Sequence, residues 1–196
     1  MKSIYYNLTL KDFIELNSVK GSDLEAKRQK LSILFKVEKE FFDGMTSAQV
    51  IDLYSDFEKL EAQPIKAVYK SKVKVGSKWF FIDYRLSQIS SAQFIDITHF
   101  AKSNPLDNIH KIVASCIRPI NWRFGKAGKY NGDEHDEISE LLLNKMKIKD
   151  AYPIMLFFCT LSSKLSDNIL SYFLIQAETM ENQLRTLTQN GDGLQR

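Results

Sequence analysis

Residues 133–137 read DEHDE and gather four carboxylates around His135. Carboxylate oxygens and imidazole nitrogens are ligands that divalent metals use in proteins. Five consecutive residues cannot all face one ion if the segment begins a helix, and acidic residues are favoured at a helix N-terminus by its dipole. We therefore interpret the segment as a helix start and expect no metal site and no cofactor.

His99 and His110 are the remaining histidines, and they lie on two separate helical segments. A nucleophilic mechanism needs a serine or cysteine beside the base, and no GxSxG elbow accompanies either histidine. We expect no catalytic residues and predict that the chain is not an enzyme. A further hypothesis is an enzyme that uses DEHDE or the histidines, but the sequence does not indicate which reaction it would catalyse.

The segment RPINWRFGKAGKY, residues 118–130, interleaves cations with aromatic rings. Cations beside stacking rings suit contact with single-stranded nucleic acid or phosphate, and contact with a protein partner is a further alternative. The segment lacks the glycine patterns of nucleotide-binding loops, and the simplest interpretation is a surface connector whose rings dock on the core. The candidate partner-binding residues are Arg118, Trp122, Arg123, Lys126, Lys129 and Tyr130.

Residues 66–86 form two alternating runs around Gly76 and Ser77, which predicts a β-hairpin whose turn begins with glycine. Four lysines would line its solvent face: Lys70, Lys72, Lys74 and Lys78. This face could bind anions, or it could be the solvated surface that protects an edge strand from pairing.

The rest of the chain has mainly helical periodicity. Helices are expected at 46–60, 90–103, 104–119 and 133–147, together with a long helix or helix pair from 149 whose apolar first half belongs to the core. An N-terminal strand is expected at 3–10. The predicted fold is mainly α with a small antiparallel β-hairpin (α+β) and a helical bundle core. Its segments are 1–64, 65–88 and 89–196.

Two stretches are near copies of each other: MTSAQVIDL at 45–53 and ISSAQFIDI at 89–97. Thr46 and Ser90 are N-cap candidates, and a glutamine follows each by three residues, which is the pattern of a capping box. Repeat architectures need three or more units, so we favour two independent helix starts over a duplication. We expect Asp52 and Asp96, which the copies share, to face solvent.

The composition of the chain limits the classes of function and location that remain. The chain has 196 residues, is 44% apolar and carries a net charge of +3, a mild excess that does not by itself indicate a nucleic-acid binder. Cys116 and Cys159 lie in apolar stretches and are expected to be buried reduced thiols. The longest apolar stretch has 11 residues and the N-terminus lacks a signal-peptide core, so we expect a soluble protein that does not enter a membrane.

The order of features from Lys66 to Ile175 resembles small morphogenesis proteins of tailed phages and prophages, particularly of Bacteroidetes hosts. The resemblance rests on KWFFIDYRLSQIS, SSAQFIDITHF, NIHKIVASCIRPI and GKYNGDEHDEISELLLNKMKIKDAYPIMLFF, which together span a little over half the chain. The chain departs from this group at Ala92, where glycine is frequent, and at residues 123–125, which are inserted.

The resemblance implies a non-enzymatic role in phage tail or virion assembly, either as an assembly chaperone or as a structural component. The implied partners are other phage structural proteins, such as tail or connector components, in the host cytoplasm during assembly or in the virion. Association with further copies of the chain stays open. The alternative is a nucleic-acid-binding module that uses residues 118–130 and the lysine-rich hairpin.

Overall fold

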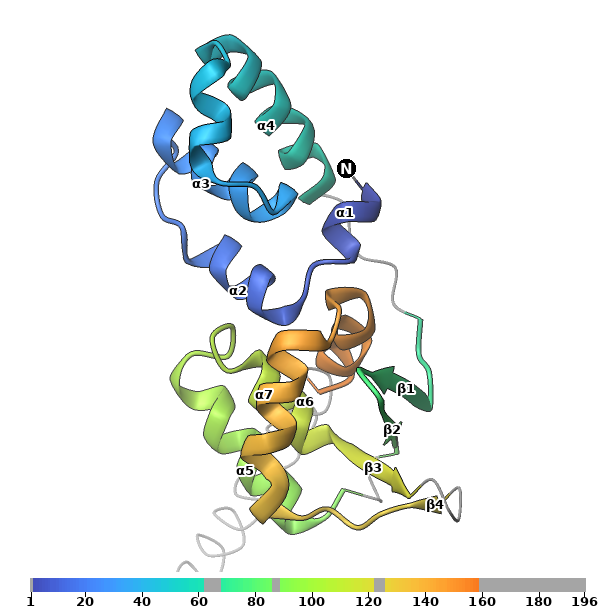
Figure 1. The fold of residues 1–196 in the computed structure, drawn as a ribbon. Coiled ribbons are helices and arrows are strands. Elements are labelled where there is room, and N and C mark those ends of the chain that lie inside the picture. The colour runs from blue at the N-terminus through green and yellow to red at the C-terminus, as the bar shows by residue number, and fades with distance from the viewer. Residues whose placement is uncertain (1, 62–67, 86–88, 122–125, 159–196) are drawn as a thin grey trace, which may run out of the picture. The chain divides into compact units, whose positions relative to one another are not determined.

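The computed structural model describes residues 2–61, 68–85, 89–121 and 126–158 (Figure 1). Within these residues the chain is mostly helical and carries one small antiparallel sheet. This confirms the predicted fold class. No helix among the described residues is long and apolar enough to cross a membrane.

One group of helices precedes residue 72 and a second group follows residue 82. The first group is α1 (Lys2–Tyr6), α2 (Leu10–Ser18), α3 (Leu24–Phe35), the 3-10 helix η1 (Lys39–Gly44) and α4 (Ser47–Glu61). The second group is α5 (Ser91–Ser103), α6 (Ile109–Cys116), the 3-10 helix η3 (Gly132–Glu134) and α7 (His135–Lys145). Residues 148–158 are also helical, and the rest of the predicted C-terminal helix lies outside the described residues.

The predicted N-terminal strand at 3–10 is wrong. Residues 2–6 form α1, in which Tyr5 is buried. Only Thr9 has strand-like pairing, as a single bridge to Lys147. Thr9 is at the same time the N-cap of α2, with a capping box to Asp12, so the chain turns into a helix directly after the bridge.

The predicted hairpin is confirmed as β1 (Lys72–Val75) and β2 (Lys78–Ile82). Gly76 begins the turn with a φ of 58°, a conformation that glycine adopts without a steric penalty. The four predicted lysines are all exposed, but Lys78 does not share a face with Lys72 and Lys74. Lys78 pairs with Val75 and therefore projects to the same, helix-covered side of the sheet, where its ammonium binds Glu137 of α7 at 2.7 Å.

The predicted helix at 104–119 and the connector at 118–130 also need correction. Helix α6 ends at Cys116, and β3 (Ile117–Asn121) follows at once and pairs antiparallel with β2. The two-residue strand β4 (Lys126–Ala127) then pairs with β3, which gives the order β1-β2-β3-β4. Pro119 lacks an N–H, and its carbonyl accepts from Gly128 at 2.8 Å where the β3–β4 ladder ends.

Residues 1–156 form one compact unit with a continuous hydrophobic core. The inner face of the sheet supplies Val73, Phe80 and Ile117 to this core. The helices contribute side chains to the same core, including Val113 of α6 and Leu142 of α7. On the opposite, outer face of the sheet, Lys72, Lys74 and Trp79 are exposed.

Candidate functional site

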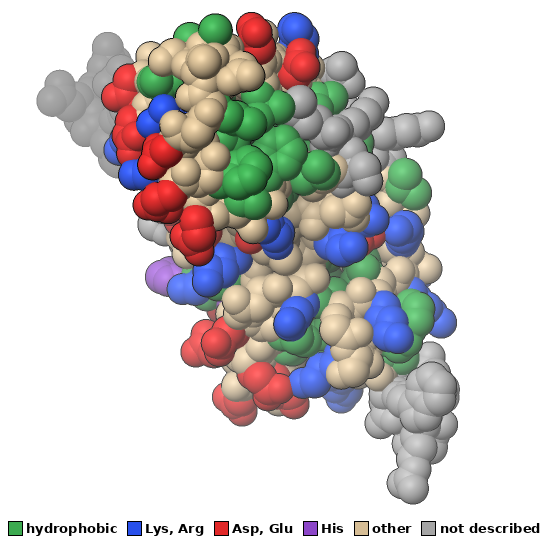
Figure 2. All heavy atoms as spheres, turned by 45° about the horizontal axis from the view of Figure 1, so that its top comes forward, with side chains coloured by type: hydrophobic (Ala, Val, Ile, Leu, Met, Phe, Trp, Pro, Cys, Tyr) green, Lys and Arg blue, Asp and Glu red, His purple; other side chains and the backbone are tan. Residues whose placement is uncertain are grey.

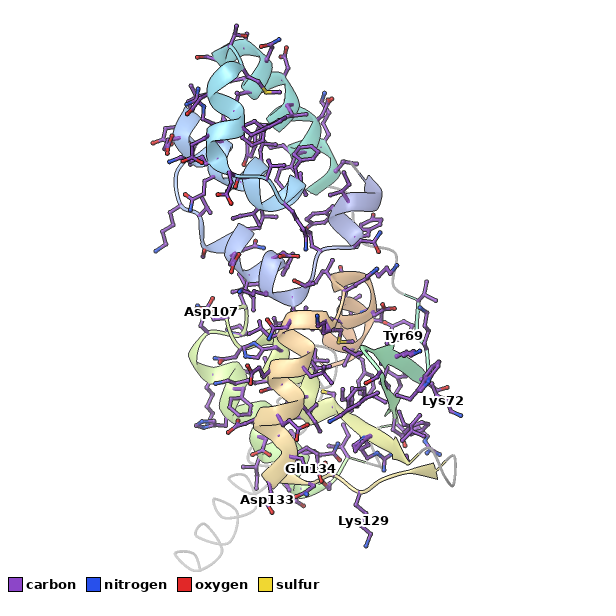
Figure 3. All side chains as sticks on the ribbon, viewed as in Figure 1. Tyr69, Lys72, Asp107, Lys129, Asp133 and Glu134 are labelled. Carbon is purple, nitrogen blue, oxygen red and sulfur yellow. The ribbon has the colours of Figure 1, made fainter. Side chains whose placement is uncertain are left out.

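The outer face of the sheet places lysines beside aromatic rings. Lys72 lies opposite Phe81 and Lys74 lies opposite Trp79 in the β1–β2 register. Directly opposed residues of an antiparallel pair project to the same face. Lys72, Lys74 and Trp79 are exposed, whereas Val73, Val75, Phe80 and Ile82 on the other face are buried. Figure 3 shows Lys72 at the rim of the sheet. We call Lys72, Lys74, Trp79, Phe81 and Arg118 the outer sheet face.

Arg118 joins this face from β3, because it pairs with Phe81. Its guanidinium lies 5.2 Å from the centre of the Phe81 ring, a cation–π contact, and binds the Asp83 carboxylate at 3.2 Å. Asp83 also binds Arg85, whose hydrogen bonds lower the pKa of Asp83. The sequence placed Arg118 in a connector separate from the hairpin, and the β2–β3 pairing brings the two together.

The other predicted partner-binding residues are placed differently. Lys129 is exposed (Figure 3). Tyr130 is half-buried, and its hydroxyl donates to the Asp96 carboxylate of α5 at 2.5 Å. Burial and this hydrogen bond raise the pKa of Tyr130. The hydrogen bond also ties the segment between β4 and α7 to α5. Trp122, Arg123 and the side chain of Lys126 lie outside the described residues.

Charge is distributed unevenly along the chain. Residues 66–156 contain 15 Lys and Arg against 9 Asp and Glu, whereas residues 1–65 contain 9 against 11. In Figure 2, lysine and arginine side chains gather in the lower right half of the view, and acidic side chains line much of its left edge. The basic excess of the chain therefore comes from the stretch that contains the sheet.

His135 of the DEHDE segment is buried rather than exposed to a metal. Its Nε2 lies 3.0 Å from Ser115 Oγ and 3.1 Å from the Lys111 carbonyl oxygen, and its ring stacks on Phe100 at 5.0 Å. The neighbouring Asp133 is exposed at the helix start (Figure 3). No group of three metal-ligating side chains converges within the described residues.

The contacts of His135 belong to a buried polar cluster that sequence reasoning missed: Gln93, Asp96, Ser115, Tyr130 and His135. Ser115 is completely buried, and its Oγ donates to the Lys111 carbonyl oxygen at 3.0 Å. The Gln93 amide donates to the Ser115 carbonyl oxygen at 2.9 Å. A serine beside a histidine has the composition of a nucleophile pair, but here both side chains are enclosed by α5, α6 and α7. The cluster therefore links helices.

The remaining titratable candidates also have structural surroundings. His99 is exposed beside the Phe100 ring. His110 is half-buried, and burial lowers its pKa, with smaller contributions from Lys111 and His135. Cys116 is a free thiol whose burial raises its pKa to about 12, which disfavours the reactive thiolate. Cys159 lies outside the described residues.

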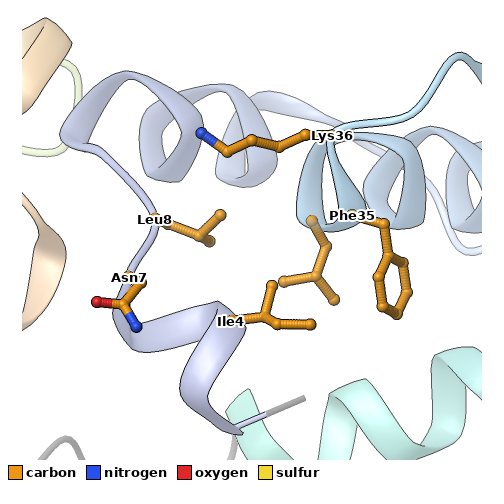
Figure 4. Close-up of a pocket in the computed structure, with 6 residues that line it drawn as sticks. Ile4, Asn7, Leu8, Phe35 and Lys36 are labelled. Carbon is orange, nitrogen blue, oxygen red and sulfur yellow. The ribbon is translucent and has the colours of Figure 1, made fainter.

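A separate apolar pocket of about 320 Å³ lies between α1 and the end of α3. Figure 4 shows Ile4, Leu8 and Phe35 around it, with Lys36 at its edge. The Lys36 ammonium binds Asp12 at 2.7 Å, so this cation already has a carboxylate partner.

Comparisons with protein-family models, curated proteins and solved structures gave no match to this chain.

Proposed function

We propose that this chain is a non-enzymatic protein of a tailed phage or prophage that binds other structural proteins during tail or virion assembly. It would act as an assembly chaperone or as a structural component, and the outer sheet face would be its binding surface. The observation that carries this proposal is Trp79, which is 42% exposed and lies opposite Lys74 on the sheet. Tryptophan and arginine are enriched among the residues that dominate protein interfaces.

The surroundings of the histidine, serine and arginine side chains support a binding role rather than catalysis. His135 and Ser115 satisfy each other and the Lys111 carbonyl inside the protein. A catalytic histidine and nucleophile must instead reach a substrate. Arg118 keeps part of its surface free while Phe81 and Asp83 hold its position, which prepares a cation for a partner with little loss of side-chain entropy.

The proposal is tested by co-expressing the chain with the products of the genes adjacent to its own. We expect a tail or connector component to form a complex that persists in size-exclusion chromatography with light scattering. Trp79→Ser should dissociate it. Ile51→Ser is the matched control, because Ile51 is 46% exposed but belongs to α4. The proposal fails if no adjacent product forms a complex, or if Trp79→Ser binds as well as the unmodified chain.

Binding of single-stranded nucleic acid is the second candidate, and the same face favours it. Sheets that bind single strands stack bases on aromatic rings and contact the phosphates with cations. Trp79 and Phe81 lie beside Lys74 and Lys72 in this way. Fluorescence anisotropy with a labelled oligothymidine should then show an affinity that falls steeply as salt rises. Absence of binding at low salt would exclude this candidate.

A further inference from the structure

Four lysines line one pocket at the edge of the sheet. The pocket has a volume of about 300 Å³. The end of β1 and the hairpin turn form one wall, and the other wall runs from the last residue of α7 into the first turn of the helix at 148–158. The lysines that line it are Lys74, Lys145, Lys147 and Lys149. Two chain segments about seventy positions apart thus contribute lysines to the lining of one pocket.

The charges of these lysines are not neutralised within the described residues. The only carboxylate in the lining, Asp150, binds Lys70 at 3.0 Å, which lies outside the lining. The ammonium groups of Lys147 and Lys149 both donate to one neutral acceptor, Asn7 Oδ1, at 3.2 and 3.0 Å. None of the four pocket lysines forms an ion pair with a described carboxylate. Like charges held together in a concave surface attract an anion.

The backbone around the pocket holds these lysines in place. Leu10 N–H donates to the Met146 carbonyl oxygen and Ile148 N–H donates to the Leu8 carbonyl oxygen, each at 2.9 Å. These bonds tie the segment that carries Lys147 to the N-terminal part of the chain. The helix then starts at residue 148, where the positive end of its dipole adds to the same potential. The cations are therefore anchored on paired backbone.

We infer that this pocket binds a phosphate group. Lysine ammonium groups contact phosphate as point charges, and several of them together match the two negative charges of a phosphate monoester better than the single charge of a carboxylate. The phosphate could belong to a small phosphorylated molecule, as a monoester with two negative charges, or to a nucleic-acid backbone, as a diester with one, since both present anionic phosphate oxygens. This inference does not depend on the proposed assembly role.

Isothermal titration calorimetry with inorganic phosphate tests the inference on the full chain, with sodium chloride of matched ionic strength as the reference. We expect saturable binding of phosphate. The double variant Lys145→Gln, Lys149→Gln should bind it about tenfold or more weakly, because two charged contacts are lost. Lys20→Gln with Lys102→Gln is the matched control, since it removes the same charge from exposed positions outside the pocket.

Thermal unfolding of both double variants establishes that they fold. Absence of saturable heat with phosphate, or an equal loss of affinity in the control, would overturn the inference. Competition then separates the sources: displacement by a single-stranded oligonucleotide assigns the site to a nucleic-acid backbone, and displacement by a nucleoside monophosphate alone assigns it to a small molecule. Trp79→Ser should bind phosphate normally, so failure of the proposed assembly role would leave this result unchanged.

Discussion

The outer sheet face and the buried polar cluster place their polar groups in opposite surroundings. In the cluster, Gln93, Ser115 and His135 direct their polar atoms at each other and at nearby backbone. On the outer sheet face, Lys74 and Trp79 lie side by side in exposed positions. Polar groups that satisfy each other stabilise the fold, and exposed ones remain available for a partner. Changes in the cluster should therefore alter stability, and changes on the face should alter binding.

The largest expected effect is the loss of stability in Gln93→Ala. This change removes a capping glutamine and leaves the buried Ser115 carbonyl without its donor, which together should cost about 3 kcal/mol. Gln49→Ala is the control, because Gln49 caps α4 in the same way but is exposed, and it should cost about 1 kcal/mol. Urea unfolding measures both, and equal losses would contradict the assignment of Gln93 to the cluster.

A smaller loss is expected for Tyr130→Phe. The substitution keeps the ring and removes the hydroxyl that donates to Asp96, which should lower the free energy of unfolding by about 1.5 kcal/mol because the acceptor is charged. Asp52→Asn changes the corresponding exposed aspartate of α4 and should stay within about 0.5 kcal/mol of the unmodified chain. Urea unfolding measures both changes. If Tyr130→Phe leaves the free energy of unfolding unchanged, the Tyr130 hydroxyl does not contribute to the stability of the cluster.

Alkaline pH should weaken the fold through the cluster's tyrosine. The folded-state pKa of Tyr130 is raised above the ordinary tyrosine value of 10.0. Near and above that pH the unfolded chain loses the proton first, so the stability falls as pH rises. Tyr84, whose pKa burial raises to about 12, contributes in the same direction. Unfolding followed from pH 8 to 11 should show this decline, and Tyr130→Phe should make it shallower. An unchanged slope would contradict the contribution of Tyr130.

The smallest effect on stability is expected on the outer sheet face. Lys72→Gln and Lys74→Gln remove exposed cations with no ion pair among the described residues. Each should change the free energy of unfolding by less than about 0.5 kcal/mol. Thermal unfolding provides the check. A loss comparable to that of Tyr130→Phe would place these lysines among the structural groups.

The sequence predicted those features that neighbouring residues determine. The capping boxes at Thr46 and Ser90 are present, with Gln49 and Gln93 accepting from the N-cap backbone at 2.9 and 3.1 Å. The hairpin turn at Gly76 is also present. Each depends on contacts within about four residues, for which residue type and spacing are sufficient information.

Features that depend on distant partners could not be predicted in this way. Asp52 and Asp96 occupy the same place in the repeated stretch, yet Asp52 is exposed as expected and Asp96 binds Tyr130, so the expectation was wrong for Asp96. Likewise, Arg118 reaches the hairpin only because β3 pairs with β2. Nothing local distinguishes either residue, since the partner lies more than thirty positions away in the sequence.

The measurement that tests the account most directly combines binding and stability in one variant. Trp79→Ser is compared with the unmodified chain for complex formation with the adjacent gene products and for urea unfolding. We expect Trp79→Ser to lose the complex, with an affinity lower by about tenfold or more, while its free energy of unfolding changes by less than about 1 kcal/mol. A complex that survives, or a loss of binding explained by unfolding, would contradict the assignment of the outer sheet face as the binding surface.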